Sequence, residues 1–236
     1  MTSNLSTLKI NLEYFFTLIW KIISLIVGIS SWVPAIAGIY SYKSINQKYK
    51  PFVYLLIIYA GFETTGQILI WLKKGQLNSA VMNLFVLIDF LFLYLLFNYW
   101  REKSNNFTDL FICISLIIIW IIDNILIHKI FYTNSSFRIV YSIILVIKSI
   151  DVINNQISKL NFQITKDPIF IASIFLLVQF AFKTIYETPF AFSLQVSDKI
   201  YLYSFIIHLA INFIGYIMFT KAILCMKKSI RLTSSY

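Results

Sequence analysis

Eight ionisable side chains lie inside long apolar stretches of the sequence, where a charge is costly. They are Glu63, Asp89, Asp123, Lys148, Asp151, Lys183, Glu187 and His208. Half of the ten acidic residues belong to this set. A charged group at membrane depth costs several kcal/mol unless it faces protein or water, so each residue is a candidate for binding a proton, a cation or a polar solute.

Helical spacing places these residues on shared faces with uncharged polar side chains. The stripes are Tyr59, Glu63 and Gln67; Tyr141, Lys148, Asp151 and Asn155; Gln179, Lys183 and Glu187; and Ser204, His208, Asn212 and Gly215. Residues three, four or seven positions apart lie on one side of a helix. We therefore expect four helices to line a common polar interior, with their Ile-, Leu- and Phe-rich faces toward lipid.

The candidate binding residues are ionisable and amide side chains of these stripes, together with Asp89 and Asp123 from two further spans. They are Glu63, Gln67, Asp89, Asp123, Lys148, Asp151, Gln179, Lys183, Glu187, His208 and Asn212. Glu63 and Asp89 are expected to bind a cation or proton, and the two lysines to set the ionisation of these carboxylates. Gln179 and Asn212 are expected to orient a ligand, in a cavity that opens outward and narrows inward.

A structural alternative exists for the same residues. Lys148 with Asp151, and Lys183 with Glu187, have the spacing of intrahelical ion pairs that only neutralise each other. Glu63 and Asp89 can equally be protonated and join helices by hydrogen bonds. Polar residues in spans often serve packing, so the two interpretations stay open for any single residue.

The composition explains why the elements that carry these residues must lie in a bilayer. Of 236 residues, 59% are hydrophobic and only 13% are charged, whereas soluble domains are about a quarter charged. A soluble chain of this size could not bury so much apolar surface. The sequence therefore predicts an all-α integral membrane protein.

Seven stretches have the roughly 20 residues that a transmembrane helix needs. We predict spans at about Ile22–Tyr42, Phe52–Leu72, Ala80–Trp100, Phe107–Ile127, Phe137–Ile157, Pro168–Thr188 and Tyr201–Ala222. Residues 1–21 form an N-terminal segment that we interpret as an interfacial helix, 22–222 the bundle of seven transmembrane helices, and 223–236 a basic cytoplasmic tail.

Proline and small residues support these boundaries. Pro51 and Pro168 open spans two and six, Pro189 closes span six, and Pro34 should kink the first span. The first span also carries small residues along one face, which predicts close helix packing. They are Ser24, Gly28, Ser31, Ala35 and Gly38.

The net charge of +10 comes mainly from residues at span ends. One side holds Lys43, Lys48, Lys50, Arg101, Lys103, Lys159, Lys166, Lys221, Lys227, Lys228 and Arg231, and the other holds Lys9, Lys21, Lys73, Lys74, Lys129, Arg138 and Lys199. Basic loops stay in the cytoplasm. We therefore predict an outside N-terminus and a cytoplasmic C-terminus, in the inner membrane of a bacterium.

The sequence lacks the motifs of several kinds of catalytic and ligand-binding site. The two histidines and two cysteines, Cys113 and Cys225, do not have metal-ligand spacing, and no Walker, Rossmann, GxSxG or HExxH motif occurs. We expect no metal, no cofactor and no nucleic-acid partner, because the basic residues flank spans instead of forming a stripe.

The expected function is that of a small permease or channel-like protein that binds a small polar or cationic solute, or a proton, in an intramembrane cavity; we do not expect an enzyme. One alternative is a membrane sensor or assembly component whose basic tail binds a cytoplasmic protein. A second is a lipid-modifying enzyme with Asp89 or Glu63 as general base and His208 as acid. Membrane lipids are expected partners, and an oligomer stays open.

Overall fold

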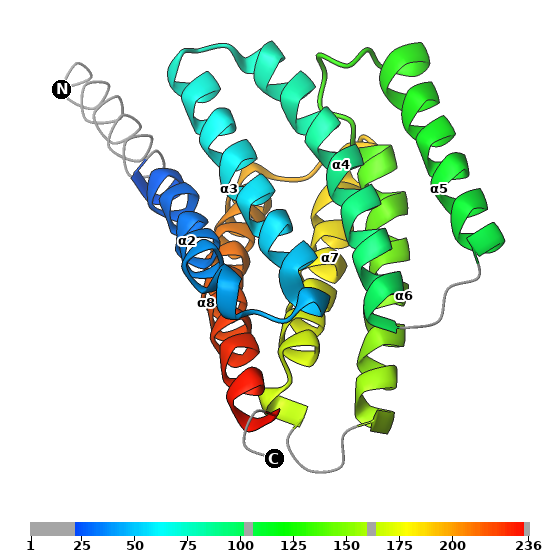
Figure 1. Ribbon diagram of the computed structural model, residues 1–236. Coiled ribbons are helices and arrows are strands. Elements are labelled where there is room, and N and C mark those ends of the chain that lie inside the picture. Colours follow the sequence, from blue (N-terminus) through cyan, green and yellow to red (C-terminus); the bar gives the residue numbers. More distant parts are fainter. Residues whose placement is uncertain (1–21, 102–105, 160–163, 234–236) are drawn as a thin grey trace.

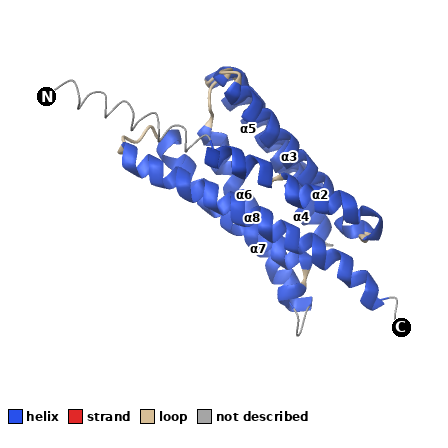
Figure 2. Cartoon of the chain, turned by 90° about the vertical axis from the view of Figure 1, so that its left-hand side faces the viewer, coloured by secondary structure: helices blue, strands red, loops and turns tan. Residues whose placement is uncertain are grey.

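A computed structural model describes residues 22–101, 106–159 and 164–233, which run as long helices with short connections (Figure 1). Figure 2 shows no strand anywhere in this described part of the chain. The predicted interfacial helix at 1–21 lies outside the described residues. So do Lys103 and the side chains of the tail residues Lys227, Lys228 and Arg231.

Six stretches are long and apolar enough to cross a membrane, which confirms six of the seven predicted spans. They are Ile22–Ser44, Gln47–Trp71, Gly75–Arg101, Phe107–Ile127, Pro168–Ala191 and Lys199–Met226. The helices are α2 (Trp32–Ser41), α3 (Lys50–Trp71), α4 (Gly75–Arg101), α5 (Asn106–Ile121), α6 (Ser135–Lys159), α7 (Pro168–Ala191) and α8 (Asp198–Thr233). A π-helical turn, Ile122–Ile127, extends α5, and α8 continues through 223–233, where we predicted a separate tail.

The predicted fifth span is the exception among the seven. It forms α6, a helix of 25 residues, and so has the length of a span. However, it carries Arg138, Lys148 and Asp151 and does not belong to the six apolar stretches. These three charged side chains pair with residues of other helices.

Proline shapes the helices largely as the sequence predicts. Pro51 and Pro168 lie in the first turns of α3 and α7. The first span is interrupted at Ser31, three residues before Pro34, because proline cannot donate a backbone hydrogen bond and its ring displaces the preceding turn. The prediction for Pro189 was wrong: α7 continues past it to Ala191, so this proline lies inside the last turn.

The small residues of the first span face the protein, as predicted. Gly28, Ser31, Ala35 and Gly38 are all buried. A Cβ atom added at Gly38 would lie only 2.8 Å from a methyl group of Val53, so only glycine allows this approach of α2 to α3. The close packing seats the first span against α3 and α8.

The tightest pair in the bundle is α6 with α7, which share the most extensive helix interface. Ser135, Ser142 and Ser149 recur every seven residues along α6 and are buried, so small side chains line the seam. In contrast, α5 stands at the edge of the bundle with most of its length exposed (Figure 1). The most closely packed helices, α6 and α7, both carry a polar stripe that the sequence predicts.

An aromatic cluster fills the half of the bundle nearer residues 42–50 and 164–167 (Figure 1). Phe52 contacts both Trp100 and Phe219, with ring centroids 5.6 and 5.4 Å apart, and Phe175 contacts Phe219 at 5.2 Å. All four side chains are at most 5% exposed. This layer joins α3, α4, α7 and α8.

Candidate functional site

A cavity of about 90 Å³ lies between α3, α4, α7 and α8, in the half of the bundle that the aromatic cluster does not fill. Its polar lining is made of Tyr59, Glu63, Asp89, Gln179, Lys183, His208, Asn212 and Tyr216, and the rings of Phe85 and Phe180 complete the wall. Six of the predicted binding residues therefore meet in one place: Glu63, Asp89, Gln179, Lys183, His208 and Asn212. Four helices contribute, as the polar stripes predict, but α4 takes the place of α6 in the lining.

Asp89 is the most deeply buried acid of the cavity, with 3% of its surface exposed. The hydroxyl of Tyr59 on α3 donates a hydrogen bond to its carboxylate at 2.5 Å. Tyr141 on α6 is a second hydroxyl donor to the same carboxylate. Two phenols therefore hold this group in place, and both belong to the predicted stripes.

Lys183 supplies the cationic side of the cavity. Its ammonium donates to the hydroxyl of Tyr141 and lies 5.0 Å from the centre of that ring, within range for a cation–π contact. The negative charges that act on it come from Asp89, Glu187 and Glu63. A single lysine is thus shared among several acids, so it neutralises no more than one of them.

Glu63 is the carboxylate with the weaker set of partners. The hydroxyl of Tyr216 on α8 donates a hydrogen bond to it. Within the described residues no lysine, arginine or histidine nitrogen comes within ion-pair distance of Glu63 or Asp89. The cavity therefore holds two carboxylates against one ammonium group.

An amide row continues the polar lining along α7 and α8. Gln179 donates to the side-chain oxygen of Asn212 at 3.2 Å, and the Asn212 amide lies 3.1 Å from Nε2 of His208. The Oε1 atom of Gln179 is buried and has no hydrogen-bond partner. It is an acceptor that a bound cation or N–H group could satisfy.

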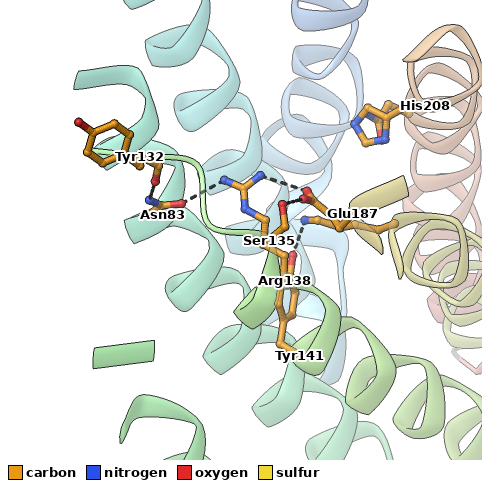
Figure 3. Close-up of polar contacts among 9 residues, drawn as sticks. Asn83, Tyr132, Ser135, Arg138, Tyr141, Glu187 and His208 are labelled. Carbon is orange, nitrogen blue, oxygen red and sulfur yellow. Dashed lines mark hydrogen bonds and ion pairs between the residues drawn. The ribbon is translucent and has the colours of Figure 1, made fainter. Parts of the chain in front are cut away.

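Above the cavity, α6 and α7 are tied together by a buried ion pair. Figure 3 shows the Arg138 guanidinium between Asn83 and Glu187. Arg138 contacts the Glu187 carboxylate at 3.2 Å and the Asn83 oxygen at 3.2 Å, and Ser135 donates to Glu187 at 2.5 Å. Asn83 in turn donates to the backbone carbonyls of Ile130 and Tyr132, which fixes the loop before α6.

The interpretation of Lys183 and Glu187 as an intrahelical pair was therefore wrong. Glu187 pairs with Arg138 on the neighbouring helix and lies outside the cavity lining. Lys183 instead contacts Tyr141. A side chain on an adjacent helix offers better geometry here than one a single turn away on the same helix.

Lys148 and Asp151 are also not paired with each other and do not line the cavity. Lys148 donates to Asn98 at 2.7 Å and lies 3.5 Å from Asp109, with its ammonium 4.3 Å from the centre of the Tyr94 ring. Asp151 pairs with Arg101 at 2.8 Å. These contacts join α6 to α4 and α5, outside the cavity.

Two further predicted residues have structural partners elsewhere. Asp123 accepts a hydrogen bond from the backbone N–H of Phe137 at 3.1 Å, in the first turn of α6, and also lies 3.1 Å from His128. Gln67 donates to the backbone carbonyl of Ser24 at 3.3 Å and so ties α3 to the first span. Neither residue lines the cavity.

The site also contains residues that the sequence did not nominate for binding. Tyr59 and Tyr141 lay on the predicted stripes, so their spacing was the available signal, whereas Tyr216 had none. Arg138 was counted as a loop residue because it directly follows the predicted start of its span. It is the fourth residue of α6, and with 15% of the side chain exposed it is an interior residue.

Comparisons with known proteins give no relatives. No protein-family model matches the sequence, and neither a curated protein nor a solved structure matches it. Among the residues that the structure describes, no three His, Cys, Asp or Glu side chains are grouped as metal ligands. The six long apolar helices define a class, a multi-pass helical membrane protein, and the function has to be argued from the cavity.

Proposed function

We propose that the chain crosses the membrane seven times, with α6 as the additional span. Five large apolar side chains are exposed on its outer face, Val140, Ile143, Ile147, Ile150 and Ile157, and Asn154 is a polar residue exposed among them. Arg138 and Lys148 of α6 are paired with acidic residues on neighbouring helices. Inserting α6 into the bilayer therefore exposes neither of these charges to lipid. On this proposal the mean hydropathy of α6 is low because its polar side chains bind neighbouring helices inside the bundle.

The orientation follows from the basic residues at the two ends of the bundle. Because Arg138 is an interior residue paired with Glu187, it no longer counts as a loop charge, which leaves six basic residues on that side against eleven on the other. Basic loops favour the cytoplasm. We place the N-terminus outside and the C-terminus in the cytoplasm, in a bacterial inner membrane.

In this arrangement the protein is a small permease or channel-like protein for a small monovalent cation or a proton. The observation that carries the proposal is the charge balance of the cavity, where Glu63 and Asp89 face a single lysine, Lys183. Arg138 and Glu187 neutralise each other above it. One negative charge is left over at membrane depth, and a bound cation or proton would neutralise it.

The lining residues have distinct parts in the proposal. Asp89, held by Tyr59 and facing Lys183, is the fixed counter-charge. Glu63, which has only the Tyr216 hydroxyl close to it, is the exchangeable binding group. The free oxygen of Gln179 completes the acceptor set. Such oxygen ligands suit a small hard cation or an ammonium ion.

Flux into proteoliposomes tests this proposal. We expect the purified chain to carry ammonium, K⁺ or protons down an imposed gradient, and Glu63→Gln and Asp89→Asn to lower that flux by about tenfold or more, the size of one lost charge-assisted hydrogen bond. Asp109→Asn is the matched control, because Asp109 lies outside the cavity. Wild-type flux equal to that of empty liposomes would refute the proposal. In that case, a protein partner that binds stoichiometrically through the basic tail would favour the sensor alternative.

A further inference from the structure

A second, much smaller cavity lies where α7 ends and α8 begins. It has a volume of about 20 Å³, and its wall includes Tyr186 and Phe190 of α7 and Tyr201 and Ser204 of α8. A space needs roughly 10–15 Å³ to hold one water molecule. We call these four residues the outer vestibule; the space between them admits a single group of about the size of water.

Three of the four residues of the outer vestibule are aromatic, and Pro189, Val196 and Ile200 also line this cavity. The rings of Phe190 and Tyr201 meet edge to face with centroids 4.8 Å apart, and Tyr186 lies 5.6 Å from Phe190. Phe190 is 40% exposed, so the vestibule reaches the surface. Aromatic faces attract small cations, and the Ser204 hydroxyl supplies an oxygen acceptor beside them.

His208 connects the outer vestibule to the polar cavity. Its ring stacks on Tyr186, with centroids 5.1 Å apart and planes at 16°. Ser204 and His208 lie four residues apart and share a face of α8. Since Tyr186 lines the vestibule and His208 lines the cavity, one stacked pair of rings separates the two spaces.

We propose that the outer vestibule is the outer binding site for a monovalent cation of about the size of water, such as ammonium or K⁺, on its way to the cavity. The inference rests on the proposed function and adds the route and a size limit. The cation sheds its water against the rings of Phe190 and Tyr201, then passes His208 toward Glu63. Larger cations such as tetramethylammonium do not fit the vestibule.

A blocking substitution tests the route. Ser204→Trp fills the vestibule, and we expect it to lower ammonium or K⁺ flux by about tenfold or more, while cation affinity at the cavity, measured by calorimetry in detergent, stays within about twofold of wild type. Ile207→Trp is the matched control, because Ile207 is one turn away and 47% exposed on the outer face of α8. Wild-type flux in Ser204→Trp, or an equal loss in both variants, would overturn the route.

Thiol accessibility gives a second reading that does not depend on a bulky side chain. In a chain with Cys113 and Cys225 replaced by serine, Ser204→Cys should react with a membrane-impermeant thiol reagent added from outside, and the reaction should block flux. Ile207→Cys should not be blocked by it. An unreactive Cys at position 204 in a conducting protein would refute the route alone, whereas absent flux and absent binding in wild type would refute the proposed function.

Discussion

Arg138 on α6 and Glu187 on α7 form an ion pair 3.2 Å long, with side chains that are 15% and 5% exposed. Neither residue has its partner on its own helix. The pair lies directly above the polar cavity and holds the two most closely packed helices together, so it links the stability of the bundle to the geometry of the site.

Removing one member of this pair should be strongly destabilising. Arg138→Ala leaves the buried Glu187 carboxylate without its cation, and we expect a loss of about 3–5 kcal/mol in the free energy of unfolding. Arg101→Ala is the control, because the Arg101–Asp151 pair is 37% and 36% exposed and such pairs contribute roughly 0–1 kcal/mol. Unfolding in mixed detergent micelles measures both; equal losses would show that Arg138 is not an interior residue.

Two lysines should differ sharply in their effect on transport. Among the described residues, Lys183 alone brings an ammonium group to the cavity lining, and we expect Lys183→Met to lower flux by about tenfold or more. Lys148→Met removes a lysine that contacts Asn98 and Asp109 outside the cavity, so flux per folded chain should stay within about twofold. A larger loss of flux in Lys148→Met than in Lys183→Met would contradict the cavity as the site and favour a site at Lys148, Asn98 and Asp109.

Gly215 tests the packing of α8 on α7 beside the cavity. A Cβ atom there would lie 2.1 Å from the ring of Phe175, which is 5% exposed and cannot easily move away. We expect Gly215→Ala to lower stability by about 1–3 kcal/mol, the usual cost of overpacking. Gly61→Ala, where nothing lies within 4 Å, should not destabilise the protein. Thermal unfolding in detergent compares the two.

Asp167 predicts a pH dependence at the start of α7. Its carboxylate caps the helix by accepting a hydrogen bond from the N–H of Phe170 at 2.7 Å, while burial raises the pKa of Asp167 above its ordinary value. The native state therefore holds a proton at this residue more tightly than the unfolded chain does, so this contribution to stability is present at low pH and is lost as pH rises through the raised pKa.

Asp167→Asn should keep the cap and remove this pH dependence. We expect the variant to gain stability relative to wild type at neutral pH, and the gain to shrink as the pH is lowered toward the ordinary pKa of an aspartate. Melting temperatures recorded in detergent across that range check the sign. A gain that grows on acidification would contradict the burial argument.

The helices themselves could be predicted from the sequence because hydropathy and helical spacing are local properties. Six spans are confirmed, as are the buried small residues at Gly28, Ser31, Ala35 and Gly38. The limits of this reasoning appear at helix ends. Pro189 was expected to end α7, but it lies within the last turn of that helix. Arg138 was expected at a span end, but it lies inside α6.

The pairing of charges could not be predicted, because it depends on which helices are neighbours. Lys148 and Asp151 have a spacing that suits an intrahelical pair, yet Lys148 contacts Asp109, which precedes it by 39 residues. Glu63 and Lys183 were expected in a common interior because of their stripes, and Asp89 because a carboxylate inside an apolar helix must avoid lipid. Tyr59 lay on a predicted stripe, whereas the partner Tyr216 comes only from the packing.

Cation binding to the purified chain tests the central claim most directly. Titration with ammonium and with K⁺ at constant ionic strength, in weak buffer with a pH-sensitive dye, records both cation binding and proton exchange. We predict saturable binding or proton exchange in wild type, a loss of about tenfold or more in affinity in Glu63→Gln, and wild-type behaviour in Asp109→Asn. A wild-type chain that neither binds a cation nor exchanges a proton, or a Glu63→Gln chain that behaves like wild type, would contradict the assignment of the cavity as a cation site.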